Sequence, residues 1–167
     1  MDIRPIIRSQ YHAALDMLAA AIDACPEPVW NRPEDANRTW RVAYHALFYV
    51  HFYLQTTEHS FVPWELHREN LEDLGDWPAA PSQDTVDTNQ SLTKAELLAY
   101  LALCRRQVDA ITPTLNLEDA SGFHWLPINK LELQLYSMRH VMQHTGELYE
   151  RLAKTTRVEL PWVGRHA

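Results

Sequence analysis

Apolar residues recur every three or four positions between residues 5 and 24, which is the spacing of one face of an α-helix. The residues of this stripe are Ile7, Tyr11, Ala14, Leu15, Leu18 and Ile22. The prolines of the sequence CPEP at residues 25–28 interrupt the pattern. The first segment is therefore predicted to be a helix that buries one side.

The segment from about residue 39 to 57 is apolar on nearly every side. Its large apolar residues are Trp40, Tyr44, Phe48, Tyr49, Phe52 and Tyr53. Thr39 is the expected N-cap, because a threonine side chain accepts a hydrogen bond from a free backbone N–H. A helix without a polar face must be covered on most sides. It lies either in the middle of a helical bundle or in a subunit interface, and on this ground we predict a homodimer.

Residues 58–92 form a connection longer than a compact domain usually leaves without structure. A short helix is expected within it, near Trp64 to Asp73. The next long helix is predicted to open at Thr93, because Glu96 stands three positions later and completes a capping box. It should run to about Ile111, before Pro113.

The last predicted helix begins near Pro127, since proline suits a first helical turn, and runs to about Ala153. Its expected core stripe is Leu131, Leu135, Met138, Val141 or Met142, Thr145, Leu148 and Leu152. No segment shows a convincing alternation of apolar and polar residues. The predicted fold is all-α: residues 1–167 form a single four-helix bundle domain with a long crossover between the second and third helices.

Composition and charge narrow the function. With 46% hydrophobic residues the chain can bury a sizeable core, and its net charge of −7 argues against nucleic acid as a partner. The longest apolar run, residues 42–54, is shorter than the ~20 residues of a membrane-spanning helix. Cys25 and Cys104 form no C-x-x-C motif, and the first ten residues lack a secretory apolar region. We expect a cytoplasmic protein whose two cysteines are small buried hydrophobes.

Two histidines, His140 and His144, stand one helical turn apart and can aim their rings at one point. Nine histidines in 167 residues would give roughly 0.4 such pairs by chance, so the spacing alone has little weight. Val141 occupies the position at which a zinc protease of the H-E-x-x-H type needs glutamate, which disfavours that class. A structural role, with both rings neutral and hydrogen-bonded, stays open.

A third histidine, His45, lies on the least polar helix, where an unpaired imidazole is costly to bury. Burial also keeps the ring neutral, which is the form that binds a cation. His51 lies about 240° further around the same helix and cannot reach the same site. Five other histidines are expected at the surface: His12, His59, His67, His124 and His166. The aromatic residues Trp40, Tyr44 and Trp125 could line a pocket above a metal, although core packing is the commoner role.

The motif AYHALF around His45, together with RHVMQHTGEL at residues 139–148, resembles the DinB/YfiT-like superfamily of metal-binding four-helix bundles. The likeness covers nearly the whole chain, including the long connection after the second helix and the sequence SLTKAELLAYL that opens the third. The resemblance implies that His45, His140 and His144 bind a divalent ion. Three nitrogens with an open position are typical of a catalytic zinc site, and imidazole also suits nickel, iron, cobalt and manganese.

Glu147 shares the side of the helix that carries His140 and His144, so it could support a ligand or move a proton. The family more often has glutamine at this position, and pairing of Glu147 with Arg151 one turn later is an equal alternative. Members of the family include transferases that use low-molecular-weight thiols, a thiol-dependent isomerase and metal hydrolases. The first expectation is therefore a thiol S-transferase acting on a small-molecule substrate. The alternatives are a metal-dependent hydrolase and a non-catalytic dimeric bundle that binds a metal or small ligand.

Overall fold

The computed structural model describes residues 1–75 and 91–166, and over these residues the chain is helical, without a β-strand. The prediction of an all-α fold is confirmed. The helices are α1 (Arg4–Ala24), α2 (Glu27–Trp30), α3 (Thr39–Tyr53), η1 (Glu58–Ser60), α4 (Lys94–Ile111), η3 (Thr112–Thr114) and α5 (Lys130–Thr156).

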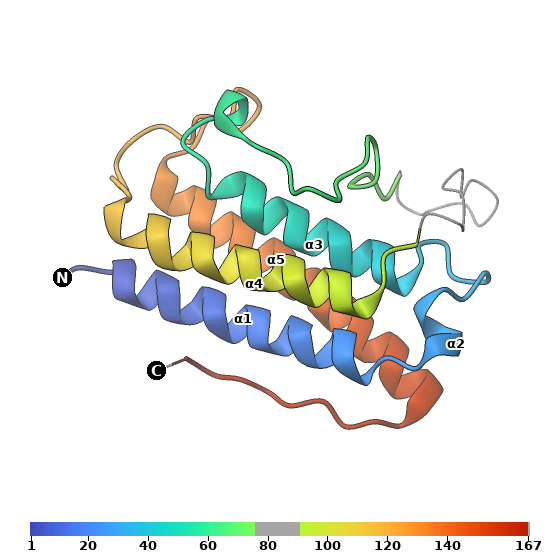
Figure 1. Ribbon diagram of the computed structural model, residues 1–167. Helices are drawn as coiled ribbons and strands as arrows, with labels where there is room; N and C mark the ends of the chain where they lie inside the picture. The colour runs from blue at the N-terminus through green and yellow to red at the C-terminus, as the bar shows by residue number, and fades with distance from the viewer. Residues whose placement is uncertain (76–90, 167) are drawn as a thin grey trace.

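The four long helices lie side by side, as Figure 1 shows. Helix α3 packs on α4 and α5, and α1 packs on the same two helices from the other side. The largest side chains that are fully buried between them include Trp40, Tyr11, Tyr44, Tyr100, Leu15, Leu18, Ile22, Leu47 and Leu97. Because each such side chain contributes about 1.5–3 kcal/mol when removed from water, this interior holds α1, α3 and α4 together. Val141, Leu148 and Leu152 are buried as well and add α5 to the same core.

The apolar surface of α3 is covered within the chain. Its inner side meets α4 and α5, while the segment from Glu58 to Gly75 runs along its outer side (Figure 1). The ring of Phe61 lies 5.2 Å from that of Phe48 on α3, and Leu71 is buried. Of the two ways to cover this helix, the described residues supply the intramolecular one. The homodimer stays a prediction.

The predicted helix near Trp64 to Asp73 is wrong. Turns replace it, in which the backbone N–H of each of three residues donates to the carbonyl three positions earlier. Asn70 has a φ of 62°, the left-handed conformation that interrupts a right-handed helix. Residues 76–90 of the predicted connection lie outside the described residues.

The predicted N-cap is confirmed at α4 and wrong at α3, although α3 does begin at Thr39 as predicted. Thr93 accepts a hydrogen bond from the Glu96 N–H, and the Glu96 carboxylate accepts from the Thr93 N–H, which completes the predicted capping box. Thr39, in contrast, is the first residue within α3 and no N-cap. Its hydroxyl was expected to cap the helix, but it donates instead to the carbonyl of Val29, at 2.9 Å.

Helix α5 begins three residues later than predicted. Asn129, and not the turn at Pro127, caps it by accepting from the Glu132 N–H at 2.9 Å. Lys130 at its start is buried and donates to the carbonyls of Gln55, Thr56 and Ser121, which satisfies backbone acceptors just after α3. Helix α3 accordingly ends at Tyr53 and not near residue 57.

Gly122 makes the close approach of these two loops feasible. It has a φ of 84°, and a Cβ built on it would lie 2.1 Å from the Thr56 carbonyl oxygen. No other residue fits there without moving the backbone. The end of α3 and the start of α5 are thereby locked together on one side of the molecule.

The predicted core stripe of α5 is confirmed from Val141 to Leu152 and is wrong nearer the start of the helix. Leu135 was expected in the core, yet 55% of it is exposed. The polar residues Gln134 and Ser137 take the interior positions, and Gln134 accepts a hydrogen bond from the Tyr11 hydroxyl at 2.9 Å. A pattern of apolar residues alone could not locate a face that includes buried polar side chains.

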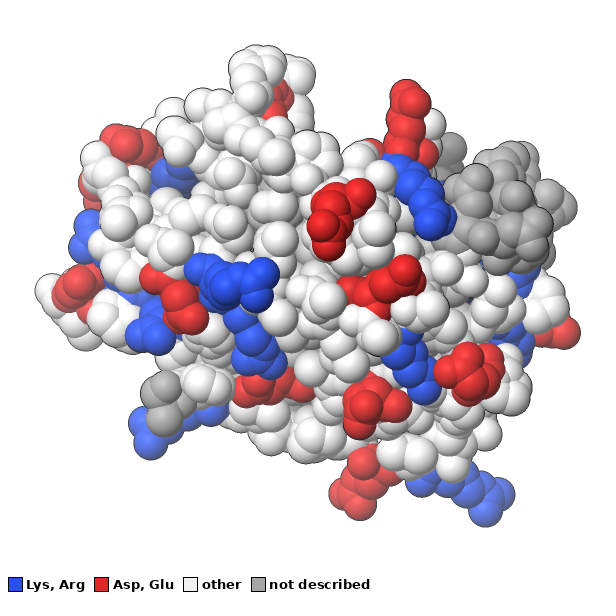
Figure 2. Space-filling model, viewed as in Figure 1, with Lys and Arg blue, Asp and Glu red and all other residues white. Residues whose placement is uncertain are grey.

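The surface mixes charges of both signs. Among the described residues on the face in Figure 2, basic and acidic side chains alternate, without the single-sign stripe that nucleic-acid-binding proteins usually present. No helix within the described residues is both long enough and apolar enough to span a bilayer.

Candidate metal centre

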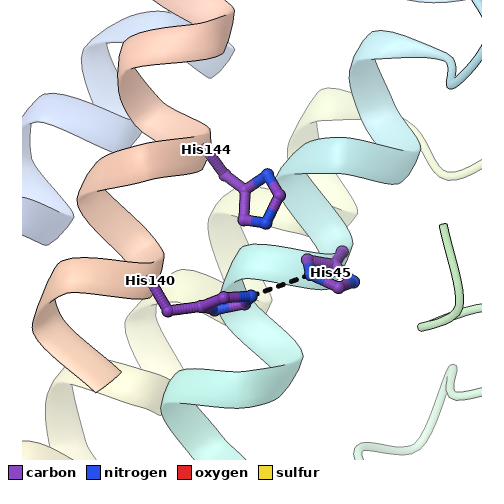
Figure 3. Close-up of side chains that lie close together, drawn as sticks. All are labelled: His45, His140 and His144. Atoms are coloured by element: carbon purple, nitrogen blue, oxygen red, sulfur yellow. Dashed lines mark hydrogen bonds between the residues drawn. The ribbon is translucent and has the colours of Figure 1, made fainter. Parts of the chain in front are cut away.

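The structure brings together three histidines from two helices. His45 projects from α3, and His140 and His144 project from successive turns of α5, as Figure 3 shows. One ring nitrogen of each lies within 4.8 Å of the others. The Nε2 atoms of His45 and His140 are 3.0 Å apart. The convergence predicted for these residues is therefore present.

The hydrogen bonds of two rings fix which nitrogen carries the proton. His45 Nδ1 lies 2.5 Å from the Glu72 backbone carbonyl, and His144 Nδ1 lies 3.2 Å from the Glu147 carboxylate. Both partners only accept hydrogen bonds, so Nδ1 donates in each case. A neutral ring that donates from Nδ1 has its lone pair on Nε2. These two rings are thus prepared to bind a cation through Nε2.

His140 is different, because its Nδ1 is buried and has no hydrogen-bond partner among the described residues. Its ring is placed by packing instead. The ring centroids of His45 and Tyr49 lie 4.9 and 5.1 Å from that of His140. A ligand to the other nitrogen would be the strongest interaction available to this ring.

Burial keeps two rings of the cluster, those of His45 and His140, uncharged. Loss of water lowers the pKa of His45 to about 4, against the partly compensating hydrogen bond to Glu72. Loss of water, reinforced by repulsion from the rings of His45 and His144, lowers the pKa of His140 to about 3. Near neutral pH both rings are therefore neutral, which leaves their lone pairs free for a metal.

The donor set fits a divalent ion. Two nitrogens bound at ~2.05 Å in a tetrahedral shell would lie about 3.3 Å apart, close to the 3.0 Å between His45 and His140. The limit of 4.8 Å for the whole group leaves His144 within a small movement of the same point. Three imidazoles with no carboxylate among them favour zinc, nickel, cobalt or iron over magnesium or calcium.

Glu147 contacts both residues that were considered as its partners, His144 and Arg151. One carboxylate oxygen lies 3.2 Å from His144 Nδ1, and the other lies 3.4 Å from Arg151 Nη2. The hydrogen bond from His144 is the main cause that lowers the pKa of Glu147, against the effect of its burial. Glu147 is thus an ionised acceptor behind a candidate ligand, and not a member of the three-histidine group itself.

The aromatic wall of the site was not predicted. It is Tyr49, whose ring centroid lies 4.8 Å from that of His45. Tyr49 follows His45 by one helical turn, so its place on the same face could have been read from the sequence. Of the three aromatics considered, Trp40 and Tyr44 are buried core residues, whereas Trp125 is 46% exposed and stacks on Phe52.

His12 was expected at the surface and is buried. Its Nε2 lies 2.9 Å from the carboxylate of Asp109 on α4, a partner that the sequence around His12 did not reveal. His67 is half-buried, with Nδ1 2.6 Å from the Tyr44 hydroxyl. The predicted surface position is confirmed for His59, His124 and His166. His51 faces Tyr100 and not the metal centre, as its position on α3 predicts.

Both cysteines are buried and free, as expected. Loss of water raises the pKa of the Cys25 thiol to about 11 and raises that of Cys104 further. Neither sulfur is an activated thiolate at neutral pH.

No family model, curated protein or solved structure matches this chain.

Proposed function

We propose that the protein is a divalent-metal-dependent enzyme of the DinB/YfiT-like four-helix-bundle type, with His45, His140 and His144 as its metal ligands. The observation that carries the proposal is the convergence of three ring nitrogens within 4.8 Å of one another. The prepared Nε2 lone pairs of His45 and His144 support it. A structural histidine needs no such common focus, since one hydrogen-bond acceptor for each ring would suffice.

The proposed reaction is transfer of a low-molecular-weight thiol. Its sulfur forms a bond to an electrophilic atom of a small-molecule substrate, the thiol proton leaves to solvent, and the leaving group departs. When bound, a divalent ion supplies Lewis acidity, which lowers the pKa of a thiol so that it is nucleophilic near neutral pH. The ring of Tyr49 offers an apolar wall beside the imidazoles for the substrate.

Hydrolysis at the same site is the second candidate, and the geometry gives it less support. It needs a general base that is free to accept a proton from water. Glu147 is the carboxylate in contact with the cluster, and its two oxygens lie against His144 and Arg151. Thiol transfer needs no such base, because the pKa of the thiol starts far below that of water. The third candidate is a metal-binding bundle without catalytic activity.

Zinc is the first choice of metal for three imidazoles, and nickel, iron, cobalt and manganese are the others to test. Protein purified without chelator should contain about one equivalent of metal per chain by elemental analysis. His140→Ala and His144→Ala should each lose it. His51→Ala is the matched control, because His51 is also a buried histidine of this bundle but does not face the site.

A panel of thiols with an electrophilic substrate separates the three candidate functions. A rate enhancement that requires metal, thiol and all three histidines supports the transferase. Turnover of esters or amides without thiol would favour the hydrolase. Metal-dependent melting without turnover on either panel would leave the non-catalytic bundle. Wild-type protein that binds none of the five metals would contradict the proposal as a whole.

A further inference from the structure

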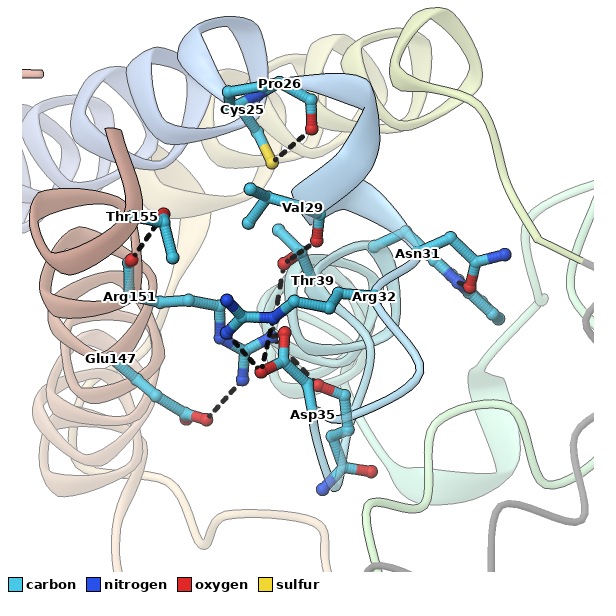
Figure 4. Close-up of polar contacts among 12 residues, drawn as sticks. Cys25, Pro26, Val29, Asn31, Arg32, Asp35, Thr39, Glu147, Arg151 and Thr155 are labelled. Atoms are coloured by element: carbon cyan, nitrogen blue, oxygen red, sulfur yellow. Dashed lines mark hydrogen bonds and ion pairs between the residues drawn. The ribbon is translucent and has the colours of Figure 1, made fainter. Parts of the chain in front are cut away.

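Arg151 is held by several partners at and just before the start of α3. It follows Glu147 by one turn of α5, and its guanidinium reaches across to the chain that leads into α3 (Figure 4). Nη1 donates to the Asn37 carbonyl at 2.9 Å and to the Thr39 hydroxyl at 3.2 Å. The same nitrogen lies 3.4 Å from an Asp35 carboxylate oxygen, while Nη2 lies 3.4 Å from Glu147.

Asp35 is itself anchored. Its other carboxylate oxygen accepts hydrogen bonds from Arg32, at 2.6 Å from Nη2 and 3.2 Å from Nε. The side chains of Asp35 and Arg151 are only 11% and 12% exposed. Two charged side chains that are this strongly buried are stable only as a pair. If one of them is removed, the other stays buried without a partner, and its desolvation is no longer compensated. The position of Arg151 is therefore tightly constrained.

Glu147 has less support of its own. Its side chain is 40% exposed, and a long flexible carboxylate at such a position has several rotamers to choose from. Arg151 attracts one oxygen, which leaves the second oxygen 3.2 Å from His144 Nδ1. Charges of alternating sign thus run from Arg32 through Asp35, Arg151 and Glu147 to the imidazole.

We infer that Arg151, anchored by Asp35, is a positioning residue that holds Glu147 against His144 and so keeps the Nε2 lone pair of His144 directed at the metal. The inference rests on the proposed function, because it assigns a role relative to that metal. It also explains why a guanidinium is needed. A planar group with donors on both nitrogens can contact Asp35 and Glu147 together, whereas a lysine ammonium presents a single point charge.

The competing interpretation is that Arg151 only ties α5 to the start of α3. The two differ in one respect: a positioning residue acts on the metal through Glu147, and a simple tie does not. A double-mutant cycle on Zn²⁺ affinity separates them. The four proteins are wild type, Arg151→Gln, Glu147→Ala and the double variant, each titrated with Zn²⁺ against a chromophoric chelator.

We expect Glu147→Ala to weaken Zn²⁺ binding by ~10–100-fold and Arg151→Gln by ~10-fold, the range found for outer partners of metal ligands. In the Glu147→Ala background, Arg151→Gln should change the affinity less than about twofold. Arg105→Gln is the matched control, since Arg105 forms a partly buried ion pair with Asp16 between α4 and α1, away from the histidines. It should leave the affinity within about twofold of wild type.

Nitrogen NMR of the metal-free protein gives a readout that needs no metal. At about pH 8, where a free imidazole is neutral, the ring shifts of His144 should report a proton on Nδ1 in wild type and in Arg105→Gln. In Arg151→Gln the ring of His144 should become a mixture of two tautomers, with the proton on Nδ1 in one and on Nε2 in the other. Asp35→Asn removes the ion pair that anchors Arg151 without changing any residue of α5. It should produce the same change in the His144 ring, and it serves as the test if Arg151→Gln does not fold.

The outcomes are distinct. Arg151→Gln binding Zn²⁺ as tightly as wild type, or losing equal affinity with and without Glu147, would overturn the positioning role. A wild-type protein that binds no metal but shows the predicted dependence of the His144 proton on Arg151 would overturn the proposed function and leave the positioning intact.

Discussion

Helix α3 carries two histidines, the half-buried His45 and the buried His51, that differ in what they contact. His45 meets two more imidazoles, His140 and His144, from α5. His51 meets the hydroxyl of Tyr100 on α4, at 3.2 Å from its Nδ1, and the edge of Phe61. Loss of water lowers the pKa of both to about 4. A buried neutral histidine is therefore not a sign of a metal by itself.

The difference lies in the groups that the ring nitrogens contact. In His45, Nδ1 donates to the Glu72 carbonyl, and Nε2 can accept a hydrogen bond from His140 Nε2 at 3.0 Å, which leaves the buried Nδ1 of His140 without a partner among the described residues. In His51 a hydroxyl can donate or accept as the ring requires. The Nδ1 atom of His51 is thus satisfied by a hydroxyl of the protein. The ring nitrogens of His45, His140 and His144, in contrast, form a group that could hold a cation.

The largest expected effect comes from removing one histidine of each kind. His45→Ala should weaken Zn²⁺ binding more than about 100-fold, beyond the loss seen when outer partners are removed. His51→Ala should leave Zn²⁺ affinity within about twofold, because the ring is no ligand. Competition with a chromophoric chelator measures both. Equal losses in the two variants would show that the cluster depends on helix packing more than on its own nitrogens.

Zinc should also stabilise the protein selectively. At a free Zn²⁺ concentration of about 100 times Kd, binding to the folded state alone contributes ~2.7 kcal/mol to the free energy of unfolding. Wild type and His51→Ala should both gain it in urea titrations, and His45→Ala should not. A gain in His45→Ala would place the ion somewhere other than the three-histidine group.

Acid should reveal what the two histidines have in common. The folded-state pKa of each is lowered, so the unfolded chain takes up protons first as pH falls below about 6.5. Between about pH 6.5 and 5, where carboxylates stay ionised, the metal-free protein should lose up to ~1.4 kcal/mol of stability per pH unit for each such histidine. Replacing either His45 or His51 by Gln should flatten this dependence. Urea midpoints measured with chelator present test it, and stability that is constant or rises toward pH 5 would contradict the assigned burial.

The periodicity of the sequence was enough for the long helices and for the sharing of one face by His140 and His144. It failed where a distant group competes for a local one. The Thr39 hydroxyl donates to the Val29 carbonyl and does not cap α3. Leu135 is exposed, while its neighbour Gln134 is buried. The turns around Asn70 depend on a left-handed residue that the apolar pattern of that segment does not disclose.

The candidate site was predictable to the same extent. Helix geometry places His140 and His144 on one face, a family resemblance of the sequence implied His45 as the third ligand, and Tyr49 could have been added from its spacing to His45. The backbone carbonyl of Glu72 and the contact between Asp35 and Arg151 join residues far apart in the chain. Such pairings depend on how loops cross the helices, which a single sequence without repeats or strong turn signals does not fix.

The smallest expected effect isolates the hydrogen bond of His51. Tyr100→Phe keeps the stacked contact with Trp64, whose ring lies 4.4 Å away, and removes only the hydroxyl. The His51 Nδ1 atom then loses its partner inside the protein, which should cost about 1 kcal/mol of the free energy of unfolding. Zn²⁺ affinity should not change, because Tyr100 contacts none of the three candidate ligands. A loss of metal binding in this variant would mean that the environment of His51 influences the three-histidine group. The two histidines would then not have separate roles.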